Sequence, residues 1–171
     1  ELNISVNVFG YPFKRPIPRN GAKLGDSIYL TGKLGKAKQG LSDWLNKENS
    51  IYCNDYLRPK PQFQKAKELS DFATSCIDIS DGLIKDLGDI CKQSNVGAEV
   101  FYEDIPILND HKDLTHGDDY ELCFTAPSHF DDQLRNQGFF IIGKIIQNLD
   151  LIVKKDGSEI TFEKNGWDPF E

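Results

Sequence analysis

Hydrophobic and polar residues alternate in several short stretches of this chain, which is the pattern of half-buried β-strands. The alternation is strictest at residues 1–9, where Leu2, Ile4, Val6 and Val8 share one face. The last part of the chain contains two apolar runs joined by Asp156-Gly157, which predicts a hairpin. Strands are predicted at residues 1–9, 27–31, 75–79, 97–102, 138–146, 150–154 and 159–162, and directly after residue 121.

Other segments repeat their apolar residues with helical spacing. The clearest is residues 83–94, with apolar positions at i, i+1, i+4, i+7 and i+8. Helices are also predicted at residues 36–47, 62–72 and 128–136, and residues 48–61 are predicted to be a loop. Strands and helices mixed along the chain favour an α/β fold, with helices packed on a mixed sheet. The inner face of the helix at residues 36–47 is predicted to carry Ala37, Leu41, Trp44 and Leu45.

Residues 10–25 are rich in proline and glycine, which predicts a linker. The strand pattern before it starts at the first residue, whereas strands normally have partners nearby. We therefore expect residues 1–10 to be the last strand of an N-terminal domain whose other strands precede this sequence. Residues 11–25 are then the linker, and residues 26–171 a C-terminal α/β domain.

Composition suits one compact folded unit, with 171 residues of which 39% are hydrophobic and 27% charged. The longest apolar runs fall far short of the roughly 20 residues that a membrane-spanning helix needs. The N-terminus lacks the pattern of a signal peptide, so a cytoplasmic location is predicted. The four cysteines are widely spaced and form no C-x-x-C motif, which argues against a disulfide framework or a zinc site.

The formal net charge of −7 argues against nucleic acid or an anionic membrane as the main partner. It is compatible with a phosphorylated small molecule, provided that a basic loop, backbone N–H groups or a divalent cation compensates the phosphate charge.

The strongest candidate for chemistry is residues 77–82, where an apolar run ends in Asp78, Ser80 and Asp81 before a glycine and the clearest helix. Two carboxylates at a strand end and a helix start can share one divalent cation. The alternative is structural: Ser80 or Asp81 caps the helix by accepting its first free N–H groups.

Four further segments each have a functional and a structural interpretation. The acidic residues 118–121 follow His116-Gly117 at the mouth of a strand, and form either a second part of a site or a solvated loop. The basic run at residues 14–23 either binds an anion or is a solvated connector. The glycine turn at residues 32–35 is either a phosphate cradle or a plain tight turn. Trp167, near the C-terminus, either docks the tail or stacks on a ligand.

Taken together, five of these segments resemble thiamine-monophosphate kinases, which belong to the aminoimidazole-ribonucleotide synthetase superfamily. The motifs occur in the family's order and span nearly the whole chain. They lie at residues 77–88, 117–122, 19–26, 57–61 and 166–168.

The resemblance implies an enzyme that uses Mg-ATP to phosphorylate thiamine monophosphate to thiamine diphosphate, with Mg²⁺ as cofactor. It implies that this chain is the C-terminal part, and that an N-terminal domain supplies further magnesium ligands, most of the nucleotide site and a homodimer interface. Carried over residue by residue, it assigns metal binding to Asp78 and Asp81, nucleotide binding to Arg19 and Ser80, and substrate binding to Asp118 and Trp167.

Two positions depart from the family pattern: His116 stands where the family usually has a glycine, and Pro169 where histidine is common. Two alternatives to the kinase remain. One is a relative that acts on another small substrate, and the other is a non-catalytic module that an N-terminal domain completes. On either the kinase or the module hypothesis, we expect the isolated chain to be inactive.

Overall fold

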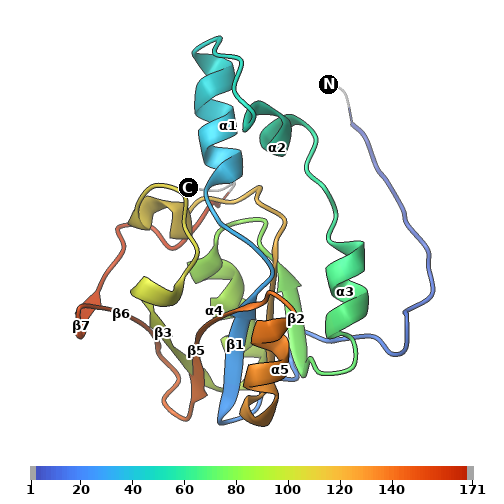
Figure 1. The fold of residues 1–171 in the computed structure, drawn as a ribbon, viewed down its shortest axis with the longest axis vertical. Coiled ribbons are helices and arrows are strands. Elements are labelled where there is room, and N and C mark those ends of the chain that lie inside the picture. Colours follow the sequence, from blue (N-terminus) through green and yellow to red (C-terminus); the bar gives the residue numbers. More distant parts are fainter. Residues whose placement is uncertain (1–2, 169–171) are drawn as a thin grey trace.

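The computed structural model describes residues 3–168, and a seven-stranded sheet forms its centre (Figure 1). The strand order is β2-β4-β1-β5-β3-β6-β7. Neighbouring strands are antiparallel except β3 and β6, which are parallel. The strands are β1 (Asp26–Leu30), β2 (Ser75–Asp78), β3 (Gly97–Phe101), β4 (Leu122–Pro127), β5 (Phe140–Ile146), β6 (Leu151–Lys155) and β7 (Ser158–Ile160).

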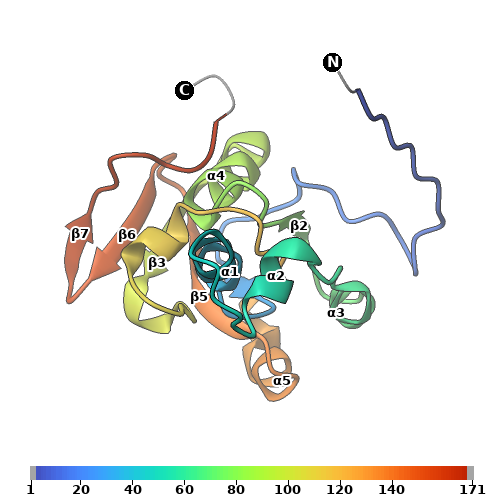
Figure 2. The same cartoon turned by 90° about the horizontal axis from the view of Figure 1, so that it is seen from above.

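Helices cover both faces of the sheet, as Figure 2 shows for α4 (Leu83–Ser94) on one side and α5 (Asp131–Asn136) on the other. Side chains alternate between the faces along β1. Ile28 and Leu30 join the core under α4, whereas Tyr29 belongs to the second core, under α5 and α3 (Phe63–Leu69). The mixed α/β fold predicted from the sequence is therefore confirmed.

Helix α4 is the best-anchored helix, as its sequence pattern predicts. Its apolar positions Leu83, Leu87 and Ile90 are fully buried. The helix ends at Asn95, which adopts the left-handed conformation with a φ of 55° and closes the last turn. This anchoring matters because the turn with the candidate carboxylates lies directly before α4.

Helix α1 (Lys36–Leu45) differs from the sequence prediction in its orientation. Trp44 and Leu45, predicted to face the core, are 50% and 64% exposed, while Ala37 is buried. The reason is that α1 stands out from the sheet and packs on a helix that the sequence did not predict, α2 (Cys53–Leu57) (Figure 1).

The strand predicted at residues 1–9 is not formed over its described part, residues 3–9. A strand needs a partner for its backbone groups, and no described strand pairs with this segment. The side chains of Ile4, Val6, Val8 and Phe9 are consequently exposed.

Residues 14–18, in contrast, are tied to the domain. Arg15 Nη2 donates to the carbonyl oxygen of Ala73 at 2.6 Å, and Cys76 N donates to that of Pro18 at 3.1 Å. The linker therefore covers the outer edge of β2.

Within residues 3–168, no helix is both long and apolar enough to cross a membrane.

All four cysteines are free thiols. Burial raises the pKa of Cys76 to about 12 and that of Cys91 to about 11.

Candidate functional site

The sharp turn at residues 79–82 follows Asp78, the last residue of β2. Gly82 has a φ of +121°, and a Cβ atom there would lie 2.8 Å from the carbonyl carbon of Thr115. Only glycine accommodates this conformation and this close approach. The turn therefore needs the glycine that the sequence motif supplies.

Asp86 holds this turn from inside α4. Its Oδ2 atom accepts hydrogen bonds from the N–H groups of Ser80, Asp81 and Gly82 at 3.0, 3.1 and 3.1 Å. The side chain is 3% exposed, and burial raises the pKa of its carboxyl to about 6. Asp86 lies within the motif at residues 77–88, but the sequence alone assigned it no role. Its position four residues after Gly82, in the first turn of the helix, was the signal that could have identified it.

The carboxylate of Asp81 does not cap α4, which has no side-chain cap at Gly82. It pairs instead with Lys85, at 2.9 Å between Oδ2 and Nζ. Lys85 Nζ also donates to the carbonyl oxygen of Trp167 at 2.6 Å, and the hydrogen bond to Asp81 raises the pKa of Lys85. Trp167 N in turn donates to the carbonyl oxygen of Asp81 at 2.9 Å. The C-terminal tail is thus docked against the turn.

The loop at residues 115–120 lies along the other side of the turn. The N–H groups of Asp118 and Tyr120 donate to the carbonyl oxygens of Ser80 and Ile79, at 3.0 and 2.9 Å. Asp118 and Tyr120 have φ values of 66° and 50°, in the left-handed region that non-glycine residues seldom adopt. Left-handed conformations of this kind persist only where surrounding contacts impose them, and they cluster at functional sites.

These three segments surround a cleft of about 770 Å³, which we call the main cleft. Four of the six predicted site residues line it: Ser80, Asp81, Asp118 and Trp167. His116 lines it too, so a side chain stands at the cleft where the family usually has a glycine. Pro169, the other departure, lies outside the described residues. The wall opposite the acidic residues is formed by Ala37, Lys38 and Leu41 of α1 and Tyr56 of α2.

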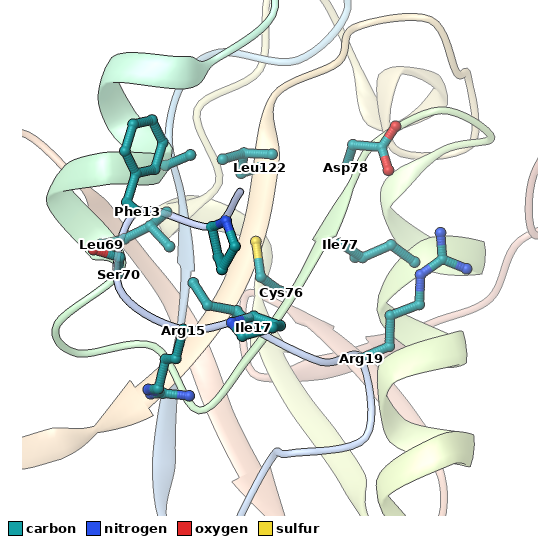
Figure 3. A pocket seen from close by; sticks show the side chains of 13 residues that line it. Phe13, Arg15, Ile17, Arg19, Leu69, Ser70, Cys76, Ile77, Asp78 and Leu122 are labelled. Carbon is teal, nitrogen blue, oxygen red and sulfur yellow. The ribbon is translucent and has the colours of Figure 1, made fainter. Parts of the chain in front are cut away.

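Asp78 and Arg19 do not line the main cleft but a neighbouring hollow of about 380 Å³, the linker pocket (Figure 3). The linker residues Phe13, Ile17 and Arg19 form one side of it, against β2 and α3. The backbone of Arg19 is held at the end of α4, where Ser94 Oγ donates to its carbonyl oxygen at 3.3 Å.

A third hollow, the proline pocket, shares lining residues with each of the other two. It has a volume of about 380 Å³ and includes Pro59, Pro61 and Phe63. It shares Asp78 with the linker pocket and Tyr120 with the main cleft. The six predicted site residues therefore line two hollows, which the proline pocket adjoins through shared residues.

The two candidate metal ligands open to different hollows. In the part of the chain that the structure describes, no three histidine, cysteine or acidic side chains are grouped to hold a metal ion. Carboxylate oxygens nevertheless fit Mg²⁺, which is commonly bound by one or two carboxylates together with substrate phosphates and water. Asp78 and Asp81 each offer one such carboxylate. Their role as metal ligands, and the sharing of one cation between them, stay predictions.

The acidic residues 118–121 divide into two roles. Asp118 is exposed at the main cleft, whereas Glu121 is buried and accepts a hydrogen bond from Thr31 Oγ1 at 2.7 Å. Asp119 accepts hydrogen bonds from the backbone N–H groups of Gly35 and Ala37, at 2.7 and 3.0 Å. Burial raises the pKa of Asp119. Because these amides are already bound to Asp119, the turn at residues 32–35 is no phosphate cradle in this structure.

Comparison with known proteins finds the family described as AIR synthase related protein, C-terminal domain, over residues 23–145. The thiamine-monophosphate kinase of Escherichia coli K12 is 35% identical over 195 aligned residues, which cover 99% of this chain and 60% of that protein. The chain thus spans about three fifths of the length of the curated relatives it matches.

The solved structures similar to this chain include the same kinases. Thiamine-monophosphate kinase from Stenotrophomonas maltophilia is 32% identical with a TM-score of 0.73, over 83% of this chain and 54% of that one. AaThiL complexed with AMPPCP and TMP is 28% identical with a TM-score of 0.76, over 90% and 54% of the two chains. The resemblance to thiamine-monophosphate kinases is confirmed, and the chain belongs to the AIR synthase related proteins, of which it contains the C-terminal domain.

Proposed function

We propose that this chain is the C-terminal part of a kinase that transfers the terminal phosphoryl group of ATP to thiamine monophosphate. The observation that carries the proposal is the main cleft, where Ser80, Asp81, Asp118 and Trp167 meet although they come from three distant segments. A relative with the same fold, AaThiL, was solved in complex with AMPPCP and TMP.

The residues have the chemistry that this reaction needs. A phosphate oxygen of thiamine monophosphate attacks the terminal phosphorus of ATP, and the bond to the leaving ADP oxygen breaks. Such a transfer depends on positioning and charge neutralisation and needs no protein nucleophile. Arg19 suits the phosphates of ATP, and Ser80 has a hydroxyl for the nucleotide.

The remaining residues suit the acceptor substrate. Trp167 is 61% exposed at the main cleft, and its indole can stack on a flat pyrimidine or on the cationic thiazolium ring. Asp118 offers a carboxylate to the same cationic molecule. Asp78 and Asp81 would hold Mg²⁺, which when bound neutralises the charge of the phosphates. The Lys85 ammonium, now paired with Asp81, would then share this carboxylate with the ion.

The proposal extends to parts of the protein beyond this chain. The exposed apolar segment at residues 3–9 supports an N-terminal domain that pairs with it. That this domain contributes the other metal ligands and forms a homodimer rests on the resemblance to thiamine-monophosphate kinases. The same segment is the observation in favour of the non-catalytic module. A relative acting on another substrate differs from the kinase at Asp118 and Trp167, since these contact the acceptor. A cytoplasmic location stays a prediction.

The test is phosphorylation of thiamine monophosphate by the chain extended with the reading frame upstream of Glu1, measured as thiamine diphosphate formed. We expect activity in the extended protein and none in the 171-residue chain. Asp78→Asn and Asp81→Asn should each reduce turnover by at least about two orders of magnitude, because phosphate charge is left uncompensated.

Asp89→Asn is the matched control, since Asp89 lies on α4 outside all three hollows, and it should retain activity. Near-normal turnover in either Asp78→Asn or Asp81→Asn would remove that residue from the metal site. Activity of the 171-residue chain alone would contradict the need for an N-terminal domain.

A further inference from the structure

Helix α1 forms one wall of the main cleft but supplies no cap of its own. Gly35 at its N-cap makes no side-chain cap hydrogen bond, and the first turn contains no acidic residue. The cap comes from Asp119, 84 residues away from Gly35. Its Oδ2 and Oδ1 atoms accept hydrogen bonds from Gly35 N at 2.7 Å and Ala37 N at 3.0 Å.

This bond joins the two walls of the main cleft. Asp119 directly follows Asp118, which lines the cleft on the loop side, and Ala37 lines it on the helix side. The loop is itself fixed to the turn by Asp118 N, which donates to the carbonyl oxygen of Ser80 at 3.0 Å. Any movement of α1 away from the loop therefore has to break the bonds to Asp119.

The other contacts of α1 with the domain are mostly polar and lie in its first half. It packs on α2 rather than on the sheet, and Trp44 and Leu45 at its far end are exposed. Three further side chains of α1 contact the domain. Lys38 Nζ lies 2.8 Å from Oδ1 of the fully buried Asp113 and 3.5 Å from Oδ1 of Asp110. Lys36 Nζ lies 3.8 Å from Oε1 of Glu121, and Gln39 Oε1 accepts a hydrogen bond from Asn109 Nδ2 at 3.3 Å. A helix with so little core contact depends strongly on bonds at its base, since hydrogen bonds to a charged group are among the stronger ones in proteins.

We infer that Asp119 is a positioning residue that fixes the distance between α1 and the substrate loop, and thereby sets the affinity of the main cleft for the acceptor substrate. The part of this inference that concerns the substrate rests on the proposed kinase function. Asp119 does not contact the substrate on this view, because both of its carboxylate oxygens are bound to the base of α1.

The test compares Asp119→Asn with Glu99→Gln, a control that also removes one carboxylate but lies in the sheet away from the three hollows. Hydrogen exchange in the 171-residue chain should show faster exchange of the Gly35 and Ala37 amides, by about tenfold or more, only in Asp119→Asn. An asparagine offers one acceptor oxygen in place of two. Asp119→Glu, which keeps two acceptors, should restore protection of at least one of the two amides.

In the extended protein, Asp119→Asn should raise the KM for thiamine monophosphate about tenfold or more, with kcat and the KM for ATP within about twofold of the parent. A general loss of structure would lower kcat and affect both substrates. Unchanged amide exchange, or equal effects on both substrates, would overturn the inference.

If Asp119→Asn does not fold, the exchange rates of the Gly35 and Ala37 amides in Asp119→Glu and in the parent decide whether Asp119 protects these amides. Absence of thiamine monophosphate turnover in the parent would refute the proposed function, while the exchange experiment would still decide whether Asp119 holds the two walls together.

Discussion

At the residue scale, carboxylates that are neighbours in the sequence have different tasks. Asp118 faces the main cleft, whereas Asp119 and Glu121 bind groups inside the fold. On the turn, Asp81 faces the cleft while Asp86 binds the turn from below. Asp118 and Asp81 line the cleft, and the carboxylates next to them, Asp119 and Asp86, bind backbone N–H groups that hold the loop and the turn.

Asp86 allows a direct test of this division. Asp86→Asn should lower the free energy of unfolding by about 1–3 kcal/mol, because three N–H groups, one of them buried, lose a charged acceptor. The measurement is urea unfolding followed by circular dichroism, with amide exchange of residues 80–82 as the local readout.

Asp89→Asn on the same helix is the control and should change the free energy by no more than about 0.5 kcal/mol. Equal stability of the Asp86 variant and its parent would show that the turn does not depend on this carboxylate.

At the element scale, the strands β3, β5 and β6 are linked by a charged cluster across the sheet. Glu99 on β3 pairs with Lys144 on β5 at 3.0 Å and also with Lys154 on β6. The hydrogen bonds to Lys154 and Lys144 lower the pKa of Glu99 below its ordinary value of 4.5. A lowered pKa means that the folded state favours the carboxylate, so this stabilisation exists above about pH 4.5 and is lost as the pH falls through the lowered pKa.

Glu99→Gln should therefore be less stable than the parent by about 0.5–1 kcal/mol at pH 7, and the difference should be smaller at pH 3 than at pH 7. Urea unfolding of both proteins at pH 7, 5 and 3 measures it. Glu163→Gln, an exposed residue after β7 and outside the cluster, is the control, with a difference within about 0.5 kcal/mol expected at each pH. A difference for Glu99→Gln that grows toward low pH would contradict the assignment.

At the scale of the whole molecule, the segment at residues 3–11 is the part that the domain does not cover. Phe9 and Tyr11 are 94% and 101% exposed, whereas Tyr29 and Phe124 are fully buried and stacked at 4.8 Å between ring centroids. Exposed aromatic side chains in a segment without secondary structure are accessible to proteases.

Chymotrypsin should therefore cut after Phe9 at least about ten times faster than at any site in the sheet, as measured by mass spectrometry over time. The bond after Tyr11 should stay intact, because Pro12 follows it. The sheet should survive intact. In the extended protein, an N-terminal domain that pairs with this segment should protect the Phe9 site. Equally fast cutting there would contradict the predicted domain arrangement.

Much of the fold was determined by the sequence itself. The period of the apolar residues located β1 and α4, and the Asp156-Gly157 turn located the hairpin of β6 and β7, because burial on one face imposes these periods locally. The candidate site segments came from the resemblance to a known family, and at Gly82 the structure supplies a physical reason for one motif residue, since only glycine fits where this turn meets another backbone.

Only the tertiary structure decided which faces of the helices are buried and which carboxylates line the cleft or bind backbone groups. The pattern at residues 36–47 could not show that α1 leaves the sheet, because the partner of its buried face, α2, is a short helix with no pattern of its own. Residues 3–9 carry a strand pattern but have no described strand beside them, and pairing depends on the partner. Asp118 and Asp119 look alike in the sequence, and their roles separate because the chain folds the loop against the turn on one side and against the base of α1 on the other.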